Sequence, residues 1–354
     1  MSMIEDYQDL DSELLTRYKS LVKTKREKIF IAIKAKFIFY ISVLYLLFRI
    51  SKTFYFYFIG CKLSSSPCTI HRDVRYSKER PRNIMDIYQP LKTKSGGNPV
   101  VVFIHGGSWM YGVKTLHIKL GRSLASQGIT TVLANYSLYP NFSGDQQVEE
   151  IGQILEYVSN HIESYGGDTR NITLMGHSAG GHLITQYLLT IYNKNTNIRE
   201  RINIKNCIPM SAPLDMREQF IFQTQLGKEH TSMIVPYCGG VKGLNYKSPL
   251  YWISLEKDKS LELPSIYLIY GDQDNLVPPI VNSRFLHQLE KKCKEHIHLQ
   301  ALEYDDVAHV DLITDIEDQE NNVCNSEPFN EHRGAITRRH KKFMLGDILR
   351  IILN

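Results

Sequence analysis

The 354-residue sequence is poor in cysteine, and its six cysteines show neither a C-x-x-C pair nor another metal-ligand spacing. We therefore expect no metal and no cofactor, and only a Cys61–Cys68 disulfide in an oxidising compartment remains open. The sequence also lacks a basic concentration beyond residues 1–60, which hold +4 of the formal charge of +5. Nucleic-acid-binding domains usually carry a basic face, so nucleic acid is not an expected partner.

The sequence has no uninterrupted apolar run of the roughly 20 residues that a membrane-spanning helix needs. A charge-free run at residues 37–48 ends at Arg49 and follows a basic stretch. We expect residues 1–62 to be a basic and then apolar N-terminal segment, in which residues 29–60 anchor the protein to a membrane by spanning it or lying in its interface. The expected location is the endoplasmic reticulum or another endomembrane. A helix packed on the rest of the protein is the alternative.

The remaining sequence, residues 70–354, alternates short apolar runs with helical patterns. A continuous apolar run at 100–104 is typical of a strand buried on both faces, and residues 145–165 have the period of a helix that stops at Gly166. The alternation predicts an α/β fold with a mostly parallel central sheet and helices on both faces. Further strands are expected at residues 83–88, 130–135, 171–175, 208–211, 265–270 and 296–304, the last closing the sheet.

Two segments interrupt this pattern. Residues 215–263 are irregular and aromatic, and we interpret them as a cap over the site, with an ordinary surface excursion as the alternative. Residues 315–333 are polar and acidic and are expected to form an exposed loop. An amphipathic helix at residues 343–353 closes the chain.

The most informative motif is G-H-S-A-G at residues 176–180, between an apolar run and a helical pattern. A serine between two glycines on a strand-to-helix turn exposes its hydroxyl above a sheet, so Ser178 is the predicted nucleophile. A hydroxyl is a weak nucleophile at neutral pH and needs a histidine base, an acid and donors for the oxyanion. The alternative is a serine in a tight turn with no chemical role.

The predicted oxyanion donors follow the apolar run 100–104, in the motif H-G-G-S-W. Glycines at a strand end let backbone N–H groups face a ligand without an obstructing side chain. We expect the amides of Gly106 and Gly107 to donate, together with the amide of Ala179. A turn that needs glycine only for its shape is the alternative.

The acid is expected after the strand at residues 265–270. Asp274 is the predicted acid, whereas Asp272 is expected to bond backbone amides in the same turn. Asp305 and Asp306 are weaker alternatives on the loop after the last expected strand.

The predicted base is His309, because Ser178, Asp274 and His309 then follow one another at successive strand ends. His309 would take the Ser178 proton, Asp274 would fix the imidazole tautomer, and water would release the acyl-enzyme. His177 and His182 flank the serine and are expected in the core or behind the site.

The order of the motifs resembles α/β-hydrolases of the carboxylesterase type, and within them isoprenylcysteine methylesterases, which remove the methyl ester from a prenylated cysteine. The resemblance covers about residues 72–312, and its motifs are D-I-Y-x-P (86–90), H-G-G-S-W (105–109), Y-G-G-D (165–168), G-H-S-A-G-G-H (176–182) and H-V-D-L (309–312). Similar methylesterases carry an apolar amino-terminal membrane segment, whereas the stretch at 315–333 departs from their pattern.

The resemblance implies a membrane-associated serine hydrolase that cleaves a carboxylic ester through an acyl-enzyme, with a small-molecule or lipidated-peptide ester as its substrate. Arylformamidase-like amide hydrolases and broad-specificity carboxylesterases share two of the motifs and remain alternatives. A non-catalytic binding protein is the alternative of another class, and the intact serine, aspartate and histidine argue against it. The sequence does not determine an oligomeric state.

Overall fold

The computed structural model describes residues 68–226, 228, 232–318 and 333–354. Its strands form one nine-stranded sheet in the order β1-β2-β4-β3-β5-β6-β7-β8-β9. Strand β2 pairs antiparallel with both of its neighbours, β1 and β4. All the other pairings in the sheet are parallel. The strands are β1 (Cys68–Arg75), β2 (Ile84–Pro90), β3 (Asn98–Ile104), β4 (Thr130–Ala134), β5 (Gly167–His177), β6 (Ile204–Met210), β7 (Ser265–Gly271), β8 (Leu299–Asp305) and β9 (Ala335–His340).

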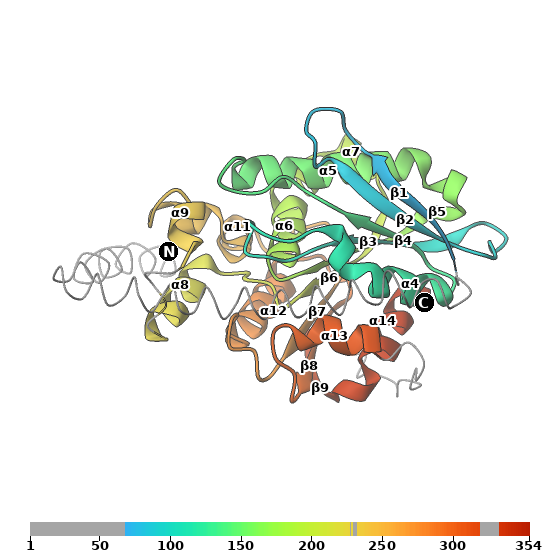
Figure 1. Cartoon of the computed structure of the whole chain (residues 1–354). Helices are drawn as coiled ribbons and strands as arrows, with labels where there is room; N and C mark the ends of the chain where they lie inside the picture. The colour runs from blue at the N-terminus through green and yellow to red at the C-terminus, as the bar shows by residue number, and fades with distance from the viewer. Residues whose placement is uncertain (1–67, 227, 229–231, 319–332) are drawn as a thin grey trace.

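Helices cover both faces of this sheet, as predicted (Figure 1). Strand β3 shows why, because Val100 and Val102 contribute to one core cluster and Val101 and Phe103 to the other. A strand that buries both sets of side chains needs a helical layer on each side. The longer helices are α4 (Ile118–Ser126), α5 (Gly144–His161), α6 (Ala179–Tyr187), α8 (Met216–Gln225), α12 (Ile280–Lys292), α13 (Asp311–Asp318) and α14 (Met344–Leu353).

Helix α5 shows how local sequence sets the element bounds. It begins with a capping box, in which the Ser143 hydroxyl accepts from the Gln146 amide and the Gln146 side chain accepts from the Ser143 amide. The helix continues in a 3-10 turn at Ile162–Tyr165 and stops at Gly166, whose φ is 73°. A left-handed glycine ends a helix at low cost, and the predicted stop at Gly166 is confirmed.

The expectation that the strand at 296–304 closes the sheet is wrong. That strand is β8, and β9 pairs parallel with it at the sheet edge. The sequence of β9, A-I-T-R-R-H, is too polar to read as a strand. Its polarity is accommodated because Arg339 is buried against Asp347 of α14 through bonds of 2.7 and 3.0 Å.

The first residues of the exposed loop expected at 315–333 instead belong to α13, which continues to Asp318. Residues 319–332 lie outside the described residues, as does the predicted anchor at 29–60. Cys61, one partner of the possible Cys61–Cys68 disulfide, also lies outside them. In the described part of the chain no helix is both long and apolar enough to cross a bilayer.

About half of the segment at 215–263, interpreted as a cap, is helical in the described residues. It contains α8 and three short helices, α9 (Ile234–Tyr237), α10 (Gly243–Tyr246) and α11 (Pro249–Leu255). Helices α8 and α9 lie beyond the end of the sheet, on the side of α6 away from β1 and β2 (Figure 1). This is the end at which the parallel strands finish, so the segment is placed where it can line a site there.

Candidate active site

Ser178 occupies a sharp turn between β5 and α6, as the motif predicted. Its φ of 53° and ψ of −120° lie outside the regions that L-residues normally adopt. The flanking glycines are required by close approach: a Cβ on Gly180 would lie 2.1 Å from the carbonyl oxygen of Ile104, and one on Gly176 would lie 2.7 Å from the carbonyl carbon of Gly180. The turn therefore holds the serine in a strained conformation of the nucleophile-elbow type.

Asp274 and His309 form a buried pair, with 2.8 Å between Asp274 Oδ2 and His309 Nδ1. The other carboxylate oxygen of Asp274 accepts the amides of Leu276 and Val277, each at 2.9 Å. Burial alone would raise the pKa of Asp274, but the hydrogen bond and charge of His309 and the two amides outweigh it, so the pKa lies below its ordinary value. The carboxylate is therefore ionised at neutral pH and orients the imidazole.

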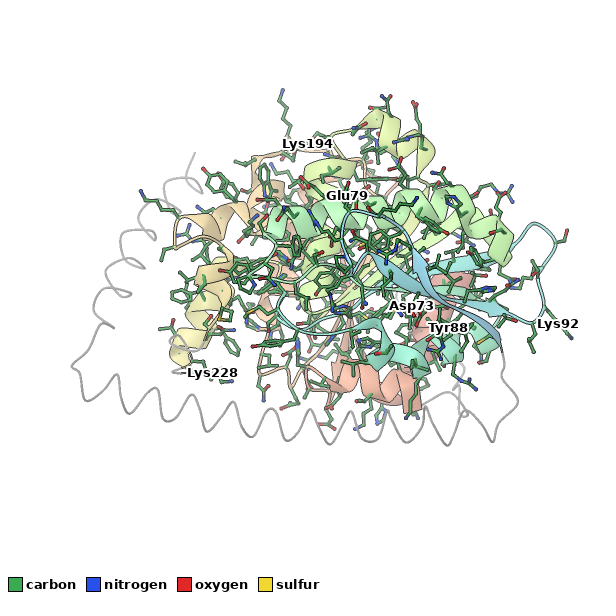
Figure 2. The ribbon with its side chains drawn as sticks, turned by 45° about the horizontal axis from the view of Figure 1, so that its top comes forward. Asp73, Glu79, Tyr88, Lys92, Lys194 and Lys228 are labelled. Carbon is green, nitrogen blue, oxygen red and sulfur yellow. The ribbon has the colours of Figure 1, made fainter. Side chains whose placement is uncertain are left out.

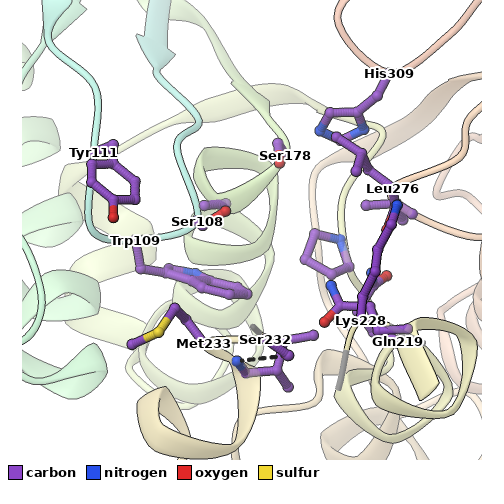
Figure 3. Close-up of a pocket in the computed structure, with 15 residues that line it drawn as sticks. Ser108, Trp109, Tyr111, Ser178, Gln219, Lys228, Ser232, Met233, Leu276 and His309 are labelled. Carbon is purple, nitrogen blue, oxygen red and sulfur yellow. Dashed lines mark hydrogen bonds between the residues drawn. The ribbon is translucent and has the colours of Figure 1, made fainter. Parts of the chain in front are cut away.

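Ser178 and His309 line the same pocket, a cavity of about 320 Å³. Figure 3 shows both side chains at one end of it, with Trp109 and Met233 at the other. Lys228 also lines the pocket, and it lies at the opposite end of the molecule from Lys92 (Figure 2). Lys92 is in the turn that leads into the amino end of β3, so the pocket lies at the carboxyl ends of the parallel strands.

The predicted oxyanion loop lies directly against the serine. A Cβ on Gly106 would be 3.0 Å from the Cβ of Ser178. Within the described residues, the amides of Gly106 and Gly107 donate no hydrogen bond. Ala179 is the first residue of α6, so its amide has no intrahelical acceptor. Gly106 is thus close to Ser178 in space, Ala179 follows it in the chain, and Gly107 is the next residue of the loop; the catalytic use of their amides remains a prediction.

The competing acids lie elsewhere. Asp272 does accept a backbone amide, at 2.9 Å, but the amide is that of Asp306 on the loop after β8 and not one in its own turn. Asp305 and Asp306 are exposed, and the described contact of His309 Nδ1 is with Asp274.

The two flanking histidines contact the site from behind. His177 Nε2 lies 2.8 Å from the carbonyl oxygen of His309 and supports that loop. His182 is fully buried and bonds Trp109 Nε1 and the carbonyl oxygen of Lys247. Their expected placement in the core or behind the site is confirmed.

Most of the pocket wall is formed by residues that no sequence motif marks. Gln219 and Gln223 of α8, Met233 and Ile234 near α9, and Leu276 all line the cavity. Helical spacing places the two glutamines on one face of α8, but no motif marks which face turns toward the serine.

A mostly parallel sheet with helices on both faces, a strained serine at a strand-to-helix turn and an aspartate–histidine pair at later strand ends define an α/β-hydrolase. The family model described as BD-FAE matches residues 85–289, which is more than half of the chain. The chain belongs to the BD-FAE family.

Comparison with individual proteins agrees with this assignment. The chain is 31% identical over 266 residues to the probable isoprenylcysteine alpha-carbonyl methylesterase ICMEL1 of Oryza sativa subsp. japonica, an alignment that covers 73% of this chain and 59% of the relative. It is 27% identical over 233 residues to the probable carboxylic ester hydrolase LipM of Mycobacterium tuberculosis, covering 64% of this chain and 53% of LipM. The alignments thus span little more than half of either relative.

Esterase B from Lactobacillus rhamnosis has the same fold. Its crystal structure matches this chain with a TM-score of 0.62 at 20% sequence identity, covering 82% of this chain and 90% of the esterase. The resemblance to α/β-hydrolases and isoprenylcysteine methylesterases that the motifs indicate is confirmed by these similarities.

Proposed function

We propose that the protein is a serine hydrolase that cleaves a carboxylic ester through an acyl-enzyme on Ser178. The observation that carries the proposal is the buried Asp274–His309 hydrogen bond of 2.8 Å beside the pocket that Ser178 lines. The ionised Asp274 carboxylate can only accept a hydrogen bond, so it keeps the imidazole hydrogen on Nδ1. The other nitrogen, Nε2, then carries no hydrogen and can accept the serine proton.

We assign each chemical step to a group of the proposed site. Ser178 Oγ attacks the ester carbonyl as its proton moves to His309, and the Asp274 carboxylate stabilises the resulting imidazolium. The amides of Gly106, Gly107 and Ala179 then bind the oxyanion. His309 returns the proton to the departing alcohol, and a water molecule activated by the same imidazole hydrolyses the acyl-enzyme.

We further propose that the substrate is an apolar ester, with the methyl ester of a prenylated cysteine as the leading example. The cavity walls include Trp109, Met233 and Ile234. A volume of about 320 Å³ is at the small end of ligand pockets, which span roughly 300–1,000 Å³. A long apolar group would therefore extend beyond the cavity over Tyr111 and Leu276, which line the pocket and are 54% and 41% exposed.

A fluorophosphonate probe tests the chemistry, because it phosphonylates an activated serine irreversibly. The wild-type protein should be labelled and the Ser178→Ala variant should not. No label on the wild type, or equal label on both, would refute the serine mechanism. Hydrolysis of a prenylcysteine methyl ester, a short-chain ester and an N-formyl aromatic amine then ranks the substrates, and preference for the amide would support an arylformamidase-like activity instead.

We propose that the protein is associated with a membrane, at the endoplasmic reticulum or another endomembrane. The proposal rests on the sequence of residues 29–60, and in particular on the charge-free run at 37–48. Fractionation of cells tests it: the full chain should sediment with membranes, and a variant with Leu46 and Leu47 both replaced by Asp should be released. Equal sedimentation of both proteins would remove the support.

A further inference from the structure

The loop that carries the proposed oxyanion donors has an unfavourable backbone. Three successive residues have positive φ: Gly107 at 123°, Ser108 at 49° and Trp109 at 63°. Glycine adopts this region freely, but serine and tryptophan do so only where neighbouring contacts hold them there. The conformation of the loop must therefore be imposed by groups outside it.

Trp109 is the residue through which the loop is held. Its indole Nε1 donates to His182 Nδ1 at 3.1 Å, and its ring stacks on Tyr237 with centroids 4.2 Å apart and planes at 14°. Its carbonyl oxygen accepts the amide of Tyr139 at 3.0 Å and the side chain of Gln147 at 2.9 Å. Trp109 is 4% exposed, so these contacts are protected from competing water.

The bond to the indole defines the state of His182. An indole nitrogen can only donate, so His182 Nδ1 carries no hydrogen and Nε2 donates to the carbonyl oxygen of Lys247 at 2.6 Å. Burial lowers the pKa of His182 to about 4, which keeps the ring neutral at working pH. His182 lies four residues after Ser178, on the next turn of α6.

We propose that His182 is a positioning residue, which fixes the oxyanion loop against Ser178 by accepting the Trp109 hydrogen bond. Ser178 directly precedes the helix that carries His182, so this bond sets the distance between the serine and the amides of Gly106 and Gly107. Oxyanion donors act only within about 2.7–3.1 Å of the developing charge. The inference rests on the proposed serine hydrolysis and assigns one more residue to it.

Two substitutions separate the bonds of His182. In His182→Asn the side-chain oxygen replaces Nδ1 and can still accept from Trp109, whereas the bond to Lys247 is lost. In His182→Gln the amide NH₂ replaces Nε2 and can still donate to Lys247, whereas the acceptor for Trp109 is lost. Positioning through Trp109 predicts that the glutamine variant is impaired and that the asparagine variant is rescued.

The expected effect is on turnover rather than on binding. With a short-chain ester, His182→Gln should lower kcat about tenfold, as expected for a displaced donor, with KM within about twofold of wild type. His182→Asn should stay within about threefold of wild-type kcat. Trp109→Phe, which keeps an aromatic ring but removes the N–H donor, should match His182→Gln, and the double variant should lose no more than either single one.

Gln186→Met is the matched control on the same helix. Gln186 Nε2 bonds the carbonyl oxygen of Tyr246 at 3.0 Å and thus joins α6 to the same segment as Lys247, without contacting Trp109. This variant should keep wild-type kcat. An equal loss in Gln186→Met and His182→Gln would overturn the proposal, because a substitution on α6 that leaves the Trp109 bond intact would then have the same effect.

The hydrogen bond itself has an independent readout, because the chain has only two tryptophans. The indole N–H signal of Trp109 should move in His182→Gln and stay in His182→Asn, while that of Trp252, bonded to the carbonyl oxygen of Tyr246 at 2.9 Å, serves as the reference. If the Trp109 signal moves and kcat does not, His182 has no positioning role. If His182→Gln does not fold, Trp109→Phe carries the same test.

Failure of the proposed function is distinguishable from failure of the positioning role. A wild-type protein that takes no phosphonate label on Ser178 refutes serine hydrolysis, and the positioning role falls with it even if the indole signal reports an intact bond. A labelled wild type with wild-type kcat in both His182→Gln and Trp109→Phe refutes the positioning role alone.

Discussion

Replacing Asp274 by asparagine should abolish most activity while leaving the fold intact, and the structure explains why the change is so specific. Asp274 Oδ1 accepts two backbone amides, from Leu276 and Val277. An asparagine at this position must keep its oxygen there, because its NH₂ group cannot accept those bonds. The NH₂ group then faces His309 Nδ1, which has to become an acceptor and moves its hydrogen to Nε2.

With hydrogen on Nε2, His309 cannot take the proton of Ser178. A wrong-tautomer imidazole typically lowers the rate by about 10³ to 10⁴, or roughly 4–5.5 kcal/mol of transition-state stabilisation. The assay is short-chain ester hydrolysis together with the rate of fluorophosphonate labelling. Asp272→Asn is the matched control, since Asp272 only accepts the Asp306 amide, and it should stay within about twofold of wild type. A folded Asp274→Asn protein with more than a tenth of wild-type activity would refute the reasoning.

The same substitution has a defined effect on stability with pH. The pKa of Asp274 is lower in the folded chain than its ordinary value, so the ionised carboxylate stabilises the fold above the unfolded pKa of about 3.9, and this contribution is lost as the pH falls through the folded pKa. The difference in melting temperature between wild type and Asp274→Asn should therefore shrink below about pH 4. A constant difference down to pH 2 would show that the charge of Asp274 does not stabilise the fold.

Two further substitutions test the framework around the site. Gly180→Ala would place a methyl group 2.1 Å from the carbonyl oxygen of Ile104, so the turn must shift; we expect a loss of at least about 3 kcal/mol in urea unfolding, as for other severe steric strain, and wild-type stability would contradict the close approach. Asp347→Ala would leave the buried Arg339 without its carboxylate partner and should cost about 3–5 kcal/mol; Arg338→Ala, which removes an exposed neighbour of the same strand, is the control and should change stability by less than about 1 kcal/mol.

Much of the fold could be predicted because short-range patterns carry it. The apolar run at 100–104 became β3, and the helical period at 145–165 became α5 and its 3-10 extension. Strand β9 could not be predicted in this way. The burial of Arg339 depends on Asp347, eight residues later in α14, and the polar sequence of β9 alone does not indicate a buried strand.

The candidate site likewise has parts that the sequence predicts and parts that depend on distant contacts. Gly176, Ser178 and Gly180 could be recognised as a turn from the motif alone, although the contact that requires glycine at position 180 is with Ile104 of β3. The choice of Asp274 over Asp272 was a prediction from position in the turn, and the observed contact with His309 depends on two loops meeting.

The sequence by itself indicated most of the strands and helices, the sharp turn at Ser178 and the residues available for chemistry, because these depend largely on nearby side chains and backbone preferences. Only the tertiary structure decided which residues meet. The bond between Trp109 and His182 joins residues 73 positions apart, and the wall that Gln219 and Met233 add to the pocket depends on how the segment after β6 folds back over the sheet. Such contacts follow from packing of the whole chain, which no local pattern records.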